Sequence, residues 1–175
     1  MRPQLRIQAV VHAAIHAVVY AAMLVTASAH PPQGTPVTPA KPPTILFMCP
    51  HGAAKSVLAS AYFQRVAKER GLNVRVESAG TDPDPTVAPA IAAHLKKSGY
   101  EVPVATPRRV TAADMAAADV VISIGCDVKD LPPGSGSLRQ WDDVPPPSED
   151  LSRAERMIRE RVIQLVDELL RKQGR

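Results

Sequence analysis

A cysteine followed by small residues, then by a lysine and a serine, is the feature of this sequence most suited to chemistry. The segment runs Cys49-Pro50-His51-Gly52-Ala53-Ala54-Lys55-Ser56. A loop that enters a helix leaves backbone N–H groups unpaired, and the helix dipole adds partial positive charge, so such a loop binds anions. The same field lowers the pKa of a thiol from its free value of about 8.5. We therefore predict an oxyanion-binding loop that presents a Cys49 thiolate.

Each position of this loop has a physical role in the prediction. Three small residues let the backbone approach an anion: Gly52, Ala53 and Ala54. Lys55 places a cation beside the anion, and Ser56 is suited to donate a hydrogen bond to the sulfur. His51 is either a proton carrier and extra anion ligand or a solvated loop residue. The alternative for Cys49 is a buried free cysteine that ends a strand.

Alternating strands and helices are predicted around the loop. Continuous apolar or alternating patterns predict strands over residues 44–48, 74–78, 119–124 and 138–141. Apolar stripes and capping signals predict helices over residues 55–70 and 88–98, a short helix after Thr111, and a last helix capped by Ser152. This order predicts an α/β fold with a mainly parallel sheet and helices on both faces. In such folds the site lies at the carboxyl ends of the strands, where the Cys49 loop also falls.

The loop resembles the Cys-x5-Arg-Ser/Thr motif of the low-molecular-weight protein tyrosine phosphatases and of the thioredoxin-coupled arsenate reductases that share their fold. Residues 77–81 resemble the Ser-Ala-Gly-Thr turn of that family, 107–121 resemble the stretch into its third strand, and 141–143, followed by prolines, resemble its acid loop. The resemblance implies a three-layer α/β sandwich with a four-stranded parallel sheet over residues 44–175. It also implies in-line attack by Cys49 on a phosphoryl or arsenyl centre, with a covalent cysteinyl intermediate.

The resemblance implies a cysteine-dependent phosphatase that acts on phosphate monoesters of the phosphotyrosine class. Two alternatives stay open: an arsenate-reductase-like oxidoreductase that uses Cys49 and Cys126, and a non-catalytic oxyanion binder. The expected partners are phosphate, arsenate or a phosphoprotein, and no cofactor or metal is expected. Cys126 ends the third strand, which in this fold lies beside the first. It is therefore a candidate resolving thiol or disulfide partner of Cys49; the alternative is a small buried residue.

Several residues depart from the family pattern. Lys55 stands where the family has Arg, and an ammonium cannot hold two oxygens in a planar fork. Pro50 follows the nucleophile and has no N–H to donate. The acid of the family is an Asp directly before Pro, but that place falls on Pro145 here. Asp143 is our candidate for protonating the leaving oxygen; the alternative is that Asp142 and Asp143 are solvent-facing acids of a turn.

Composition and charge limit the other classes of function. The chain has 175 residues, 45% of them hydrophobic, and a formal net charge of +4. Basic residues are spread among acidic ones, so nucleic acid is not an expected partner. Two cysteines make neither a disulfide framework nor a zinc site.

The N-terminal part of the chain is predicted to lie outside this domain. Residues 1–29 have a positively charged start, a long apolar run and the small-residue cleavage site Ala27-Ser28-Ala29, so they are predicted to be a signal peptide or a membrane anchor. The proline-rich residues 30–43 are predicted to be a linker. We therefore expect export to the periplasm or the outside, or membrane association through residues 7–29. The alternative is a cytoplasmic protein that starts at Met23.

Overall fold

The computed structural model describes residues 41–132 and 134–174. The predicted signal peptide or anchor, and all but the last residues of the predicted linker, lie outside these described residues. Within the described part of the chain, no helix is long and apolar enough to cross a membrane. The first strand begins at Thr44, directly after the predicted linker.

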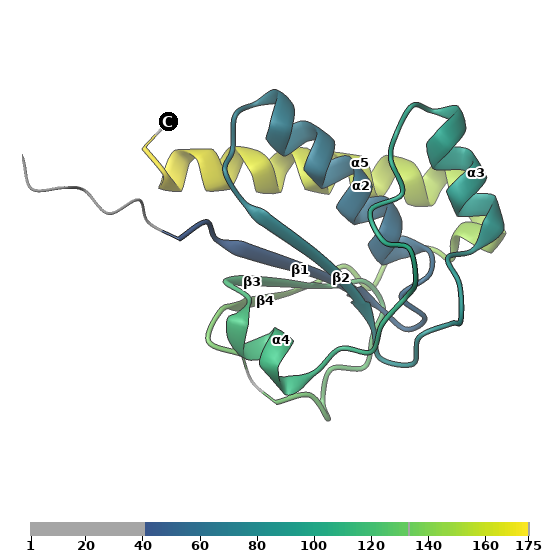
Figure 1. Cartoon of the computed structure of the whole chain (residues 1–175), viewed down its shortest axis with the longest axis horizontal. Helices are drawn as coiled ribbons and strands as arrows, with labels where there is room; N and C mark the ends of the chain where they lie inside the picture. Colours follow the sequence, from purple (N-terminus) through teal and green to yellow (C-terminus); the bar gives the residue numbers. More distant parts are fainter. Residues whose placement is uncertain (1–40, 133, 175) are drawn as a thin grey trace, which may run out of the picture. The chain divides into compact units, whose positions relative to one another are not determined.

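The described residues form a three-layer α/β sandwich around one parallel sheet (Figure 1). The strands are β1 (Thr44–Cys49), β2 (Arg75–Gly80), β3 (Val120–Ser123) and β4 (Ser137–Gln140). The helices are α2 (Lys55–Glu69), α3 (Pro89–Lys97), α4 (Ala112–Ala117) and α5 (Pro147–Lys172). The strand order is β2-β1-β3-β4 and every pair is parallel, which confirms the predicted α/β class. Helices α2, α3 and α5 cover one face of the sheet and α4 covers the other (Figure 1).

Burial on both faces explains why β1 is a continuous apolar run. Every residue of β1 is buried. Successive side chains of a strand point to opposite faces, so Phe47 and Cys49 pack in the cluster with α2 and α5, whereas Leu46 and Met48 pack in the cluster with α4. The ring of Phe47 also contacts that of Trp141, with the centroids 6.0 Å apart. The alternation therefore directs the Cys49 side chain toward the layer that contains α2.

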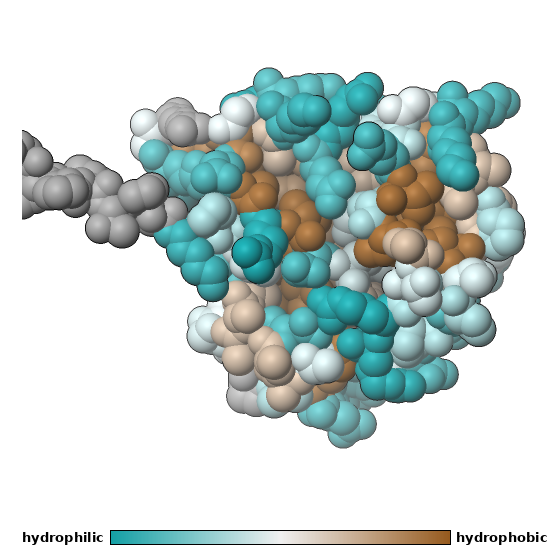
Figure 2. All heavy atoms as spheres, in the orientation of Figure 1, coloured by the Kyte–Doolittle hydropathy of each residue, from teal (hydrophilic) through white to brown (hydrophobic). Residues whose placement is uncertain are grey.

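The face of the domain drawn in Figure 2 is mostly polar. On the face that Figure 2 shows, hydrophilic side chains surround hydrophobic ones that reach the surface beside α3. Large exposed hydrophobic side chains among the described residues are Leu138 and Ile163.

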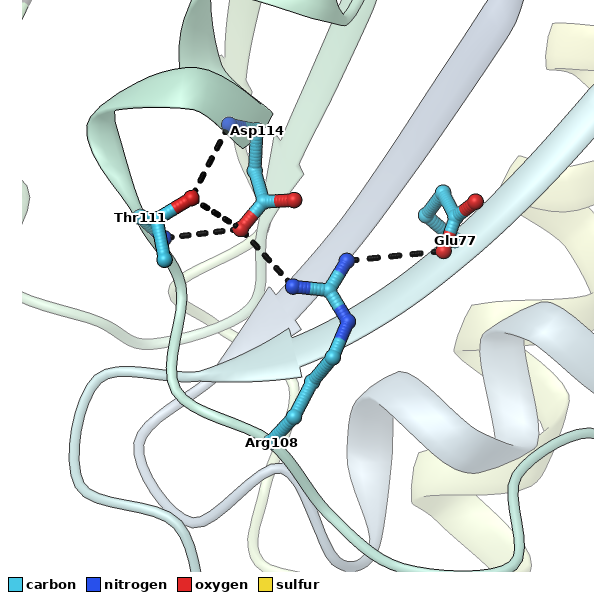
Figure 3. A network of polar contacts seen from close by, with 4 residues as sticks. All are labelled: Glu77, Arg108, Thr111 and Asp114. Carbon is cyan, nitrogen blue, oxygen red and sulfur yellow. Dashed lines mark hydrogen bonds and ion pairs between the residues drawn. The ribbon is translucent and has the colours of Figure 1, made fainter.

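A network of polar side chains joins α4 to β2 (Figure 3). Thr111 and Asp114 form the predicted capping box, with the Asp114 N–H donating to the Thr111 hydroxyl at 3.2 Å. Arg108 donates to Asp114 at 2.7 Å and to Glu77 of β2 at 3.4 Å. Gly80 at the end of β2 then exchanges backbone hydrogen bonds with residues 108–110 at 2.9 and 2.8 Å. These bonds hold residues 108–110 beside the end of β2, where β2 meets the Cys49 loop.

The start of α5 differs from the prediction. The helix begins at Pro147 rather than after Ser152, and non-helical Asp150 (φ −146°, ψ 84°) interrupts it. The Asp150 carboxylate accepts a hydrogen bond from the Arg153 N–H at 2.9 Å, which is the bond of an N-cap residue. The capping box predicted at Ser152 is therefore wrong, because Asp150 caps the main helical segment two residues earlier. The other predicted elements form within about two residues of their expected bounds.

Candidate active site

Cys49 ends β1 at the carboxyl edge of the sheet. Its side chain is buried, with 2% of its surface exposed, and its Sγ lies 3.2 Å from Oγ of Ser56 in a hydrogen bond. Ser56 is fully buried in the first turn of α2. A hydroxyl donates to a thiolate when the cysteine is ionised, and hydrogen bonds to charged groups are worth about 1.5–3 kcal/mol. The structure therefore brings together the predicted nucleophile and the residue predicted to stabilise it.

The backbone of the loop is oriented by the segment that follows β2. Three carbonyl groups accept hydrogen bonds from backbone N–H groups of that segment: Pro50 from Asp82 at 2.8 Å, His51 from Asp84 at 3.0 Å and Ala53 from Ala88 at 3.0 Å. Within a planar trans peptide the N–H points opposite to the C=O, so the N–H groups that follow these carbonyls point away from the segment. Those of His51 and Ala54 have no acceptor among the described residues, whereas that of Gly52 donates to the Cys49 carbonyl at 3.3 Å. His51 and Ala54 therefore supply free donors at this side of the loop, whereas Gly52 does not.

Two glycines permit the close contact between the loop and the end of β2. A Cβ at Gly52 would lie 2.9 Å from the Gly80 nitrogen, and a Cβ at Gly80 would lie 2.6 Å from the Gly52 nitrogen. Gly52 also has φ +60°, a conformation that other residues rarely adopt. Gly52 thus serves the shape of the loop rather than anion binding.

A cavity of about 430 Å³ opens over the loop. Its lining residues are Cys49, Pro50, His51, Ala54, Lys55, Ala88, Ala90, Ile91, Pro146, Pro147, Ser148 and Leu151. Among the predicted site residues, Cys49, His51, Ala54 and Lys55 line it, while Gly52, Ala53 and Ser56 are buried behind them. Most of the wall is aliphatic or proline, so the cavity combines a polar floor with an apolar wall. The start of α3 and the start of α5 provide that wall, which the sequence patterns did not reveal.

Lys55 spans the space between the Cys49 loop and two other loops. Its Nζ donates to the carbonyl of Val144, after β4, at 3.4 Å. A Cβ at Gly125, which has φ +74°, would lie 2.8 Å from the same Nζ. Because an ammonium has three N–H donors, two remain for an anion after the bond to Val144. The Lys55 side chain needs Gly125 for its position, and neither Gly125 nor Val144 was predicted to belong to the site.

Asp143, the predicted proton donor, does not line the cavity. Arg161 of α5 donates to its carboxylate at 2.6 Å, and 62% of the Asp143 side chain is exposed. The hydrogen bond from Arg161 holds the pKa of Asp143 below its usual value, so the carboxyl is ionised and unsuited to donate a proton. Arg161 lies 18 residues further along the chain, so no local pattern indicated this pairing. The position of Asp143 argues against the role predicted for it.

His51 lies at the mouth of the cavity and has a partner. Its Nδ1 is 3.3 Å from the Asp84 carboxylate, and the two side chains are 64% and 50% exposed. Asp84 comes from the segment after β2 whose backbone also binds the loop. Asp84 was not predicted as a site residue, because its pairing with His51 joins two separate loops.

Cys126 is buried in the loop after β3, near Cys49 but in a different hydrophobic cluster. It packs in the cluster that contains Met48 and α4, whereas Cys49 packs in the cluster with α2 and α5, and both thiols are free. Burial, with a smaller effect from the nearby Cys49, raises the pKa of Cys126 to about 11. Its backbone N–H donates to the Ser123 hydroxyl at 3.4 Å. The raised pKa favours the protonated thiol of Cys126 at neutral pH, and the two cysteines form no disulfide.

No group of three or more His, Cys, Asp or Glu side chains within residues 41–132 and 134–174 is arranged to hold a metal ion. The groups gathered at the cavity and its loop are a thiol, free backbone N–H donors, a lysine and a histidine. This set can bind a tetrahedral oxyanion and attack its central atom.

Two comparisons with known sequences match most of this chain. The family model described as low molecular weight phosphotyrosine protein phosphatase matches residues 44–173. A protein of Halobacterium salinarum named putative arsenate reductase is 26% identical over 127 residues, which are 70% of this chain and 89% of the relative.

Solved structures show the same fold. A thioredoxin-dependent arsenate reductase of Corynebacterium glutamicum superposes with a TM-score of 0.67 and 26% identity, and the match covers 77% of this chain and 65% of that one. A low molecular weight phosphotyrosine phosphatase of Vibrio cholerae superposes with a TM-score of 0.65 and 24% identity, and the match covers 75% and 99% of the two chains. This chain belongs to the low molecular weight phosphotyrosine protein phosphatase family.

Proposed function

We propose that the protein is a cysteine-dependent phosphatase that hydrolyses a phosphate monoester through a phosphorylated Cys49. The observation that carries the proposal is the buried Cys49 Sγ at 3.2 Å from Ser56 Oγ, at the floor of a cavity with free loop N–H groups. The aliphatic wall suits the apolar part of an aryl phosphate, as in phosphotyrosine. The expected substrate is therefore a phosphoprotein or a small aryl phosphate.

The reaction would take place in two steps. The Cys49 thiolate attacks phosphorus, a sulfur–phosphorus bond forms and the bond from phosphorus to the leaving oxygen breaks. The N–H groups of His51 and Ala54 and the Lys55 ammonium stabilise the charge on the other phosphoryl oxygens. Water then attacks phosphorus and releases the Cys49 thiolate, which the Ser56 hydroxyl stabilises. Inorganic phosphate leaves and the enzyme is restored.

A burst assay tests this proposal. The reduced protein is mixed with 4-nitrophenyl phosphate, and acid-quenched samples are analysed by mass spectrometry for phosphate on Cys49. We expect a burst of nitrophenol and a phosphorylated Cys49 in the wild type, and neither in Cys49→Ser. Cys126→Ser is the matched control and should keep the burst. Absence of turnover that depends on Cys49 would rule out a phosphatase; tight phosphate binding in that case would leave a non-catalytic oxyanion binder.

Arsenate reduction is the second candidate. It is favoured by the free thiol of Cys126, since two thiols that oxidise to a disulfide supply the two electrons that arsenate needs. The raised pKa of Cys126 makes arsenate reduction the weaker candidate, because thiol–disulfide exchange requires a thiolate. Arsenate turnover with thioredoxin that is lost in both Cys49→Ser and Cys126→Ser would support reduction. Turnover that survives Cys126→Ser would exclude Cys126 as the resolving thiol.

We also propose export or membrane anchoring through residues 1–29. The support is the order of positive charge, apolar run and small-residue site in the sequence. Mass spectrometry of the N-terminus in fractionated cells tests it. A mature chain that begins at His30, or an intact chain in the membrane fraction, is expected. A cytosolic chain with an intact Met1 or with Met23 first would contradict the proposal.

A further inference from the structure

We propose that His51 and Asp84 form a proton-donating pair, in which His51 protonates the leaving oxygen and Asp84 positions it. The inference rests on the proposed phosphatase function and deepens it. It names a further catalytic residue and explains how the site would act on phosphate esters with basic leaving groups.

The site requires a proton donor that the acid loop does not provide. A proton transferred to the leaving oxygen typically contributes about 10²–10⁴ to the rate. Pro145 stands where the family resemblance implies an acid, and Asp143 binds Arg161 outside the cavity. Among the described residues that line the cavity, the titratable ones are Cys49, His51 and Lys55. Cys49 is the nucleophile and Lys55 donates to Val144, which leaves His51 for the proton.

The geometry of His51 suits this role. Its Nδ1 is 3.3 Å from the Asp84 carboxylate, while its Nε2 has no partner among the described residues. A carboxylate at one ring nitrogen orients the imidazole, so the other nitrogen can give a proton and regain it. Both side chains are at least half exposed, so water can reprotonate the pair between turnovers.

The backbone holds the two residues together before any ligand binds. The Asp84 N–H donates to the His51 carbonyl at 3.0 Å, and the Asp82 N–H donates to the Pro50 carbonyl at 2.8 Å. The Thr81 hydroxyl adds a bond to the same Pro50 carbonyl at 3.4 Å. The neighbouring charge of Asp82 is paired with Arg109 at 3.0 Å, so Asp84 is the carboxylate that faces the imidazole.

The proton balance of the reaction is complete with this pair. As the sulfur–phosphorus bond forms and the phosphorus–oxygen bond breaks, the proton on Nε2 of His51 moves to the leaving oxygen. Neutral His51 then accepts a proton from the water whose oxygen attacks the phosphoryl group, and the Cys49 thiolate leaves. No oxidant or other co-reactant is needed.

Two substrates with different leaving groups test the inference. The leaving group of phenyl phosphate resembles the tyrosine side chain, with a pKa of about 10, and needs a proton. The nitrophenolate of 4-nitrophenyl phosphate leaves without being protonated. We therefore expect His51→Gln to lower turnover of phenyl phosphate about 100-fold and turnover of 4-nitrophenyl phosphate much less. Asp84→Asn should shift the ratio of the two rates in the same direction by a smaller factor.

His94→Gln is the matched control, because His94 also pairs with a carboxylate, that of Glu155 at 3.2 Å, but does not line the cavity. It should leave the ratio of the two rates unchanged. If His51→Gln left the ratio of the two rates unchanged, whether or not both rates fell, the inference would be overturned. A wild type without Cys49-dependent turnover of either substrate would overturn the proposed function itself, and with it the role of the pair.

Discussion

At the scale of single residues, the hydroxyl of Ser56 controls how well Cys49 leaves in the second step. We expect Ser56→Ala to lower the steady-state rate by about 10- to 100-fold, because a hydrogen bond to a charged group is worth about 1.5–3 kcal/mol. The burst should persist, since the first step consumes the thiolate rather than releasing it. Stopped-flow absorbance with 4-nitrophenyl phosphate measures both phases.

Ser60→Ala is the control for that variant. Ser60 is buried in the same helix, and its hydroxyl has no hydrogen-bond partner among the described residues. It should therefore keep the wild-type steady-state rate. If both variants have the same rate, the Ser56 hydroxyl has no role in releasing Cys49.

Cys126 is expected to react slowly with alkylating reagents at neutral pH. Burial raises its pKa to about 11, and only the thiolate is a strong nucleophile. In Cys49→Ser, the rate of iodoacetamide labelling of Cys126, followed by mass spectrometry, should keep increasing with pH toward about 11. The unfolded protein should level off near its free value of about 8.5. A plateau near that free value in the folded protein would contradict the prediction.

At the scale of elements, three loops meet at the Lys55 ammonium. Gly125, after β3, leaves the space that Lys55 Nζ occupies, and Val144, after β4, accepts its hydrogen bond. We expect Gly125→Ala to displace the Lys55 ammonium and to lower the rate with 4-nitrophenyl phosphate at least tenfold. Complete loss of a group that stabilises transition-state charge usually lowers the rate by about 10²–10³. It should also cost about 1–2 kcal/mol of unfolding free energy, because φ is +74°.

Gly99→Ala separates these two effects. Gly99 has φ +73°, but nothing lies within 4 Å of a Cβ placed there. It should lose similar stability in urea denaturation and keep its activity. Equal activity losses in both variants would show that the contact with Lys55 is not the cause.

At the scale of the whole molecule, an ion pair joins α5 to β4, the edge strand of the sheet. Arg139 of β4 donates two hydrogen bonds to Glu168 at 2.7 Å each, and Lys172 adds a contact at 2.8 Å. The bonds from Arg139 and Lys172 lower the pKa of Glu168 from 4.5 to about 2. Because the folded pKa lies below the unfolded one, this contribution to stability is full above about pH 4.5 and is lost as pH falls toward 2.

We therefore expect Glu168→Gln to be less stable than the wild type at neutral pH and to lose less stability between about pH 5 and pH 2. Urea denaturation at a series of pH values measures this. Glu69→Gln is the control, since Glu69 pairs with Arg65 on an exposed face of α2 at 2.8 Å and such pairs contribute little. The same pH slope in Glu168→Gln and the wild type would contradict the prediction.

Local patterns in the sequence were enough to determine the sheet and the nucleophile loop. The apolar run of residues 44–48 can bury both faces only in a parallel sheet with helices on each side, which is what forms. Cys49, Lys55 and Ser56 were predicted as a unit because a strand-to-helix turn fixes their spacing through the backbone. The capping box at Thr111 was predicted for the same reason, since its hydrogen bonds join residues three apart.

The tertiary structure alone decided which charges face the nucleophile. Asp143 pairs with Arg161, which is 18 residues away in the sequence, and so lies outside the cavity. Asp84 pairs with His51, which is 33 residues away (84 − 51), because the fold brings separate loops to one edge of the sheet. The end of β1 and the loop after β3 likewise put Cys49 and Cys126 in different hydrophobic clusters. Sequence patterns describe bonds between near neighbours, whereas the pairing of charges between loops depends on distances that only the folded chain sets.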